Sequence, residues 1–130
     1  VRIITNSAYR AHTDHLFMKL RILKLEQVHS YAVGLFMFKL DKKVLPPVAF
    51  SLATKNVDVH NYNTRQAQSL HVPLAKTNIL FKSVRVIGVH IWNYILKKQI
   101  PTKSVHLFKH HWKKHLMTYQ PSIASNYLNA

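Results

Sequence analysis

The sequence predicts an α+β domain that is mainly α, with amphipathic helices around one core and a small β-hairpin between about residues 70 and 88. Two segments, 25–40 and 104–119, place apolar residues at spacings of three and four, which is the helical period. A shorter segment, 81–87, alternates apolar and other residues instead, which favours a strand. Prolines separate these segments and predict where the helices end.

The first twenty residues predict two short helical pieces. Residues 1–6 have the pattern of a helix end, with Ile3 and Ile4 as its buried residues. Thr13 is the expected N-cap of the next helix, because its hydroxyl can accept a hydrogen bond from a free amide of the first turn. Asp14 follows where the helix dipole favours a negative charge. This helix carries a single apolar stripe, formed by Leu16, Phe17 and Leu20.

Residues 25–40 form the longest predicted helix. Gly34 lies inside it at a cost of about 1 kcal/mol relative to alanine, so we expect a neighbouring backbone to pack closely there. Leu45-Pro46-Pro47 ends this unit, residues 48–53 predict one more short helix, and residues 54–66 predict a loop. The apolar stripe of the long helix is predicted to consist of Leu25, Val28, Ala32, Leu35, Phe36 and Leu40.

The hairpin is predicted from two short segments. Residues 70–73 suit an edge strand, because Pro73 has no amide proton to donate to a ladder. In the second strand, residues 81–87, Val84 and Val86 point one way. Gly88 is then expected to allow a sharp turn into a helix of about residues 89–98, which Pro101 closes. Its core face is predicted to contain Ile91, Trp92, Ile95 and Leu96.

The last helix is predicted to begin after Ser104, which is a plausible N-cap. Trp92 and Trp112 both lie on apolar stripes, so both are assigned to the core. After Pro121 no period remains, which predicts a single domain over residues 1–120 and a flexible tail over 121–130. The stripe of the last helix consists of Val105, Phe108, Trp112, Leu116 and Tyr119.

The charge of the chain is strongly positive and unevenly distributed. The formal net charge is +15, from 19 Lys and Arg against 4 acids. All four acids lie in residues 1–58; residues 59–130 hold ten Lys and Arg, no acid, and seven of the 10 His. Such an excess attracts a polyanion, so nucleic acid is the expected partner. We expect binding by backbone charge, through Tyr62, Arg65, Lys76, Lys82, Arg85, Lys97, Lys98, Lys109, Lys113 and Lys114.

Two of these assignments have alternatives. Tyr62 and Arg65, with His60, could stack on unpaired bases or grip phosphates, but Tyr62 could equally anchor its loop and Arg65 bind a carbonyl or carboxylate. The basic helix 104–118 could lie along a nucleic-acid backbone, present a solvated face, or bind an acidic membrane surface or a calmodulin-like partner. The charge of the whole second half favours nucleic acid.

Several function classes are disfavoured by what the sequence lacks. There is no cysteine, no glycine-rich phosphate loop, and no cluster of carboxylates for two-metal chemistry. His106 with His110, and His111 with His115, have the spacing of paired ligands, yet without cysteines or nearby acids we expect no metal site and no cofactor. No apolar run is long enough to suggest a membrane span. The chain is therefore expected not to catalyse a reaction or to have a small-molecule substrate.

A set of short motifs in a fixed order carries a resemblance to a known family. Its most specific parts are Ala-His-Thr followed by Leu-Phe, and Tyr-Asn-Thr-Arg followed by Trp-Asn. With these motifs the chain resembles, to about Tyr119, the C-terminal region of the polyproteins of jockey-like non-LTR retrotransposons. The motifs are Val1-Arg-Ile-Ile-Thr-Asn, Tyr9-Arg-Ala-His-Thr13, Leu16-Phe17-Met-Lys-Leu20, Ile22-Leu-Lys-Leu25, Leu45-Pro46, His60-Asn-Tyr-Asn-Thr-Arg65, Leu70-His-Val-Pro73, Ile91-Trp92-Asn93 and Phe108-Lys109.

The resemblance implies a post-thumb region that follows the fingers, palm and thumb of a reverse transcriptase. The catalytic aspartates of that family lie in the palm, upstream of Val1, so no catalytic residue is expected here and the chain is expected to be a fragment of a longer protein. The implied partners are the upstream polymerase domains and RNA, an RNA–DNA hybrid or a DNA duplex. The implied location is intracellular, in the nucleus and cytoplasm.

The chain also departs from the family pattern. Relatives commonly have Gly-Pro before the Trp-Asn pair and Leu-Pro after it, where this chain has Gly88-Val89 and Tyr94-Ile95. His15 likewise replaces a common proline. These departures fit a divergent copy. Two other interpretations stay open: a structural or protein-interaction module that packs on the polymerase thumb, and a translated transposon remnant without a function.

Overall fold

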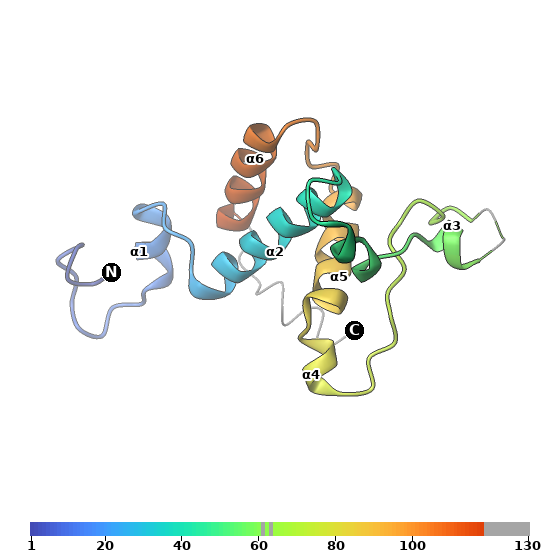
Figure 1. Ribbon diagram of the computed structural model, residues 1–130. Helices are drawn as coiled ribbons and strands as arrows, with labels where there is room; N and C mark the ends of the chain where they lie inside the picture. Colours follow the sequence, from blue (N-terminus) through green and yellow to red (C-terminus); the bar gives the residue numbers. More distant parts are fainter. Residues whose placement is uncertain (61, 63, 119–130) are drawn as a thin grey trace.

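Three helices form the core of the fold. The computed structural model describes residues 1–60, 62 and 64–118, and the prediction of a mainly α fold is confirmed. Helix α2 (Leu25–Asp41) packs against both α5 (Val84–Lys97) and α6 (Val105–Thr118), as Figure 1 shows. Shorter elements surround this core: α1 (Asp14–Lys19), the 3₁₀ helix η1 (Pro47–Leu52), α3 (Asn56–Val59) and α4 (Asn78–Phe81).

Aromatic side chains fill the space between the three core helices. The ring of Phe38 in α2 stacks on Phe108 of α6 with their centroids 4.7 Å apart, and Trp92 of α5 meets Phe38 edge-on at 6.5 Å. Trp92 is 2% exposed and Trp112 is fully buried, so their assignment to the core is confirmed. Aromatic pairs of this kind stabilise by about 0.5–1.5 kcal/mol beyond the area they bury.

Helix α2 has the predicted length but buries a different face. Leu25 is 86% exposed, and Val28 and Ala32 also face solvent, so the predicted stripe is wrong at these positions. Nearly every residue of α2 after position 30 is apolar, so more than one stripe fits the helical period. Contact with α5 and α6 selects the face; its buried residues are Ser30, Val33, Gly34, Met37, Phe38 and Leu40.

Trp112 of α6 packs directly against Gly34 of α2. A Cβ atom added at Gly34 would collide with Nε1 of Trp112 and would lie 3.0 Å from its Cε2. The same indole donates a hydrogen bond from Nε1 to the carbonyl oxygen of Ser30 at 3.4 Å. The predicted close approach at Gly34 is confirmed, although a tryptophan ring rather than a backbone makes it.

The predicted β-hairpin is absent from the described residues. Residues 81–87 span the junction between α4 and α5, where Ser83 ends one helix and begins the next: its carbonyl accepts from the amide of Ile87 at 3.0 Å. Val86 and Ile87 pack into the core instead, and burial overrides their preference for strands. Within the described ranges, bridge pairing is limited to an isolated antiparallel bridge between Lys55 and Leu70.

Gly88 lies in the middle of α5 and makes no turn, which corrects the prediction. A Cβ there would lie 2.8 Å from Sδ of Met37, so Gly88 allows α2 to cross α5 closely. Val89 has an amide proton that can donate to the helix ladder, so the helix continues through this position. Helix α5 therefore starts at Val84 and not at about residue 89; Leu96, expected in the core, is 40% exposed.

The N-terminal segment extends away from the core (Figure 1). Residues 1–6 form turns and no helix, and Ile3 and Ile4, predicted to be buried, are 96% and 72% exposed. Thr13 does precede α1, but its side chain makes no capping hydrogen bond. Leu16 is buried beneath this short helix, and Asp14 pairs with Lys24 Nζ at 2.8 Å.

Other predictions concern the connections and the chain end. The expected helix over residues 48–53 is present as η1, and residues 54–60, 62 and 64–66 are a loop interrupted by the single turn of α3. The tail 121–130 and Tyr119 lie outside the described residues. No helix of the described part is long and apolar enough to cross a membrane.

Candidate nucleic-acid interface

The solvent-facing side of α6 carries the densest group of cations. Ser104 begins this helix as predicted, since its hydroxyl accepts from the amide of Leu107 at 3.3 Å and its carbonyl from the amide of Phe108 at 2.9 Å. Phe108, Trp112 and Leu116 fix the helix on the core, whereas Val105 is exposed. The opposite side, which we call the basic face of α6, consists of the exposed residues His106, Lys109, His110, Lys113 and Lys114.

The C-terminal end of α5 lies beside α6. The Tyr94 hydroxyl and His115 Nε2 are 3.0 Å apart, and the His115 ring stacks on Trp112 with centroids 5.8 Å apart. Lys98 Nζ lies 5.8 Å from the centre of the Tyr94 ring. Burial, and then the nearby charge of Lys98, lower the pKa of His115. Lys98 and the exposed Lys97 therefore add positive charge next to α6.

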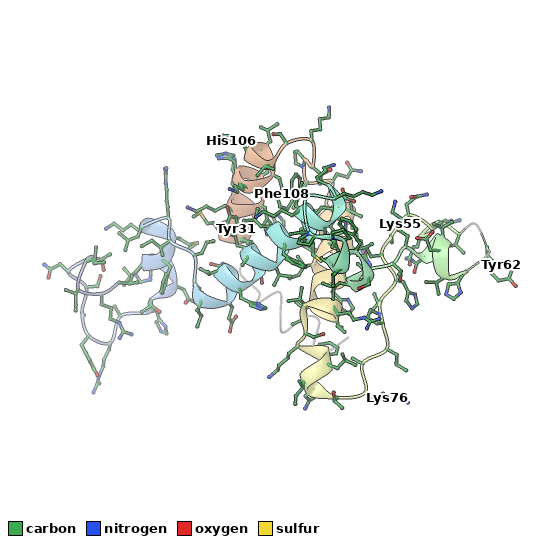
Figure 2. The ribbon with its side chains drawn as sticks, viewed as in Figure 1. Tyr31, Lys55, Tyr62, Lys76, His106 and Phe108 are labelled. Atoms are coloured by element: carbon green, nitrogen blue, oxygen red, sulfur yellow. The ribbon has the colours of Figure 1, made fainter. Side chains whose placement is uncertain are left out.

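Three further predicted contacts surround α4 at the other end of α5. Lys76, Lys82 and Arg85 are exposed, and Figure 2 shows Lys76 at the foot of the molecule, far from His106 at the start of α6. Burial lowers the pKa of His90, whose ring lies 6.3 Å from that of Phe81. This group of cations and the basic face of α6 are separate sites on the molecule.

Tyr62 and Arg65 lie in a third place, at the end of the loop that contains α3. Tyr62 is 79% exposed, and Figure 2 shows it at the far tip of this loop. The base of the loop is closed by backbone hydrogen bonds, from the amide of Asn56 to Ser69 at 3.0 Å and from the amide of His71 to Thr54 at 2.8 Å. Tyr62 is thus available for stacking and does not anchor the loop by burial.

The basic residues of this half share one electrostatic property. Within residues 59–60, 62 and 64–118, all ten Lys and Arg side chains are exposed, and none has a carboxylate within 4 Å. The two ion pairs in the described part, Asp14–Lys24 and Asp41–Lys42, both lie earlier in the chain. Uncompensated surface cations cost little in water and attract polyanions over a Debye length of about 8 Å at physiological salt.

The histidines do not assemble into a metal centre in the described part of the chain. No group of three or more His, Asp or Glu side chains there is arranged to hold a metal ion. His106 and His110 share the exposed face of α6, and the rings of His110 and His111 meet edge-on at 5.6 Å. His115 is directed to Tyr94 and Trp112 instead.

Sequence reasoning missed the residues that hold these surfaces in place. Asn93 accepts from the amide of Leu70 at 2.9 Å and donates to its carbonyl at 2.8 Å, so it clamps the loop that contains α3 to helix α5. Gln27 accepts from the amide of Lys24 and donates to the Leu116 carbonyl, at 2.9 and 2.7 Å, which joins the start of α2 to the last turn of α6. A polar residue beside a buried tryptophan was the available signal for Asn93.

Comparison with known proteins adds no further constraint. No protein-family model, no curated protein and no solved structure matches this chain.

Proposed function

We propose that this chain binds nucleic acid by backbone charge, as the post-thumb appendage of a jockey-like non-LTR reverse transcriptase. One observation carries the proposal: the described residues of the acid-free half present ten exposed Lys and Arg side chains without an ion pair among them. A cation buried in an ion pair with a carboxylate would have a structural role. Exposed cations without ion pairs, at this density, favour an anionic partner. The motif resemblance supports a reverse transcriptase as the parent protein.

In this proposal the basic face of α6 lies along a phosphate backbone. Lys109 and Lys113 are one helical turn apart, about 6 Å along the axis, and Lys114 lies about 100° around the helix from Lys113. Their ammonium groups replace condensed counterions, whose release supplies the affinity. The buried stripe opposite holds the helix rigidly, so little order has to be gained on binding. The chain positions template RNA or primer–template and performs no chemical step itself.

A salt titration tests this function. If the lysines of α6 and of the end of α5 each neutralise one phosphate, the logarithm of the binding constant for a DNA duplex should fall with a slope of about −4 to −5 against the logarithm of the salt concentration. Single-stranded RNA should give a slope of smaller magnitude, because about 0.7 rather than 0.9 counterions are released per contact. Affinity that stays flat from low to physiological salt would contradict the proposal.

A second function, protein docking, is favoured by the N-terminal segment. Ile3, Tyr9 and Leu25 are 96%, 87% and 86% exposed, and apolar side chains in this number rarely face water without a partner. In this alternative the segment packs on the upstream polymerase domains. A pull-down from nuclease-treated lysate separates the two functions: partners retained by the wild type and lost on Tyr9→Ser with Leu25→Ser would support docking.

A further inference from the structure

A cavity of about 350 Å³ opens between the C-terminal end of α2, η1, α3 and the middle of α5. Its floor is apolar and partly aromatic, with Phe50, Leu70 and Trp92 among its residues. Four of its lining residues are charged and exposed, so we place them at its mouth: Asp41, Lys43, Lys55 and Asp58. Figure 2 shows Lys55 where the chain leaves the helical core for the α3 loop. The volume is at the small end of ligand sites, which suits one aromatic ring system.

The walls of this cavity are held before any ligand arrives. Trp92 is 2% exposed and packs edge-on against Phe38, which fixes its ring. Asn93 clamps both backbone groups of Leu70, and Leu70 in turn forms the bridge with Lys55, which is also a lining residue. A preformed cavity loses little entropy when it is filled.

No single structural role explains why both carboxylates lie at the mouth. Asp41 is the last residue of α2, where the helix dipole disfavours a negative charge. Its ion pair with the adjacent Lys42 is loose, at 3.5 Å, and its side chain is 40% exposed. Asp58 lies on a different element, α3, yet reaches the same mouth. Half of the four acids in a chain of net charge +15 thus gather at one small opening.

A carboxylate repels a phosphate backbone. On a surface that binds a polyanion it is favourable only if the ligand donates a hydrogen bond to it. Nucleobases that carry an exocyclic amino group offer that donor on the edge that single-stranded RNA exposes, and carboxylates accept from it. The partly exposed apolar side chains of Phe50 and Leu70 suit contact with the ring of such a base. Lys43 and Lys55 can meet the phosphates on either side of it.

We propose that this cavity, which we call the α2–α3 pocket, takes one unstacked nucleobase with an exocyclic amino group from a single-stranded nucleic acid. This inference rests on the proposed function and adds a base preference to it. A comparison of cytosine with uracil tests the preference for an amino group, because the two rings have the same size. Cytosine presents an amino group at C4, whereas uracil presents a carbonyl oxygen that a carboxylate would repel.

The test compares short oligocytidine and oligouridine strands on the full chain near pH 7.5, at one salt concentration. Wild-type protein should prefer oligocytidine by about fivefold or more, the discrimination typical of a good base-edge contact. Asp41→Asn with Asp58→Asn should bring the ratio close to one, because an amide can donate to the uracil carbonyl. Asp14→Asn with Glu26→Gln removes the same two charges outside the pocket and should leave the ratio unchanged.

The outcomes separate this inference from the function on which it rests. The pocket proposal is wrong if wild type binds the two strands equally, or if the pocket variant retains the preference. Salt-dependent duplex binding would then still support the proposed function. If neither strand nor the duplex binds, both proposals fail. An unchanged helical circular dichroism spectrum of each variant shows that a lost preference does not come from unfolding.

Discussion

Replacing Gly34 by alanine tests the contact between α2 and the indole of Trp112. In a free helix this change stabilises by about 1 kcal/mol. Here the new methyl group would collide with the indole of Trp112, which is fully buried and stacks on His115, so the ring cannot move away without disturbing the core. Overpacking costs about 1–3 kcal/mol, and loss of the indole hydrogen bond to Ser30 about 1 kcal/mol more. The net expectation is a destabilisation of about 1–3 kcal/mol.

Gly88→Ala is the matched control, because it is the same substitution inside another core helix. Its methyl group meets the thioether of Met37, a flexible chain that can change rotamer, so the gain in helix propensity should roughly offset the cost. Urea denaturation followed by circular dichroism measures both variants, with the denaturant slope expected to stay constant. If Gly34→Ala is as stable as wild type while Gly88→Ala is the weaker variant, the packing of α6 on α2 described above is wrong.

Two further changes have defined outcomes. Asn93→Ala leaves both backbone groups of Leu70 without their partner, so it should lower the free energy of unfolding by about 2 kcal/mol. It should also raise the rate of amide hydrogen exchange in residues 54–71. Unchanged exchange would mean that the clamp does not hold the loop. Acidification should destabilise the fold below about pH 6.5, because the lowered pKa values of His90 and His115 let the unfolded chain take up protons first. Urea midpoints measured against pH should fall less steeply for His90→Gln with His115→Gln, and an identical slope would contradict this cause.

The sequence was sufficient where a helix has only one apolar stripe. In α6 the positions between Phe108, Trp112 and Leu116 are mostly lysine and histidine, and lysine is rarely buried. The core positions Phe108, Trp112 and Leu116, the cap at Ser104 and the exposure of the predicted cations followed from spacing, whereas the prediction of Val105 on the core face was wrong. In α2 apolar residues exceed what one face can bury, so the helical period alone could not choose between faces. Gly34 and Ser30 decide it, because only small residues admit the indole of Trp112.

The rest depends on contacts between distant parts of the chain. Val86 and Ile87 favour a strand locally, and their burial against other helices makes them helical. Ile3 and Ile4 were expected in a core, but in the described fold no element packs over them. Spacing in the sequence could not predict which candidate contacts share one surface. Lys98 lies beside His115, whereas Lys76 and Tyr62 lie on other parts of the molecule. The α2–α3 pocket depends on a clamp between residues 70 and 93, which no local pattern indicates.

If backbone charge on α6 binds nucleic acid, salt titrations of two matched double variants should differ. Lys109→Gln with Lys113→Gln removes two cations from the basic face of α6, and Lys19→Gln with Lys39→Gln removes two exposed cations from α1 and α2. Both double variants have the same net charge. The α6 variant should reduce the magnitude of the salt slope for duplex binding by about 1.8, whereas the control should keep the wild-type slope. Equal slopes for the two double variants would show that overall charge, and not the surface of α6, attracts the nucleic acid.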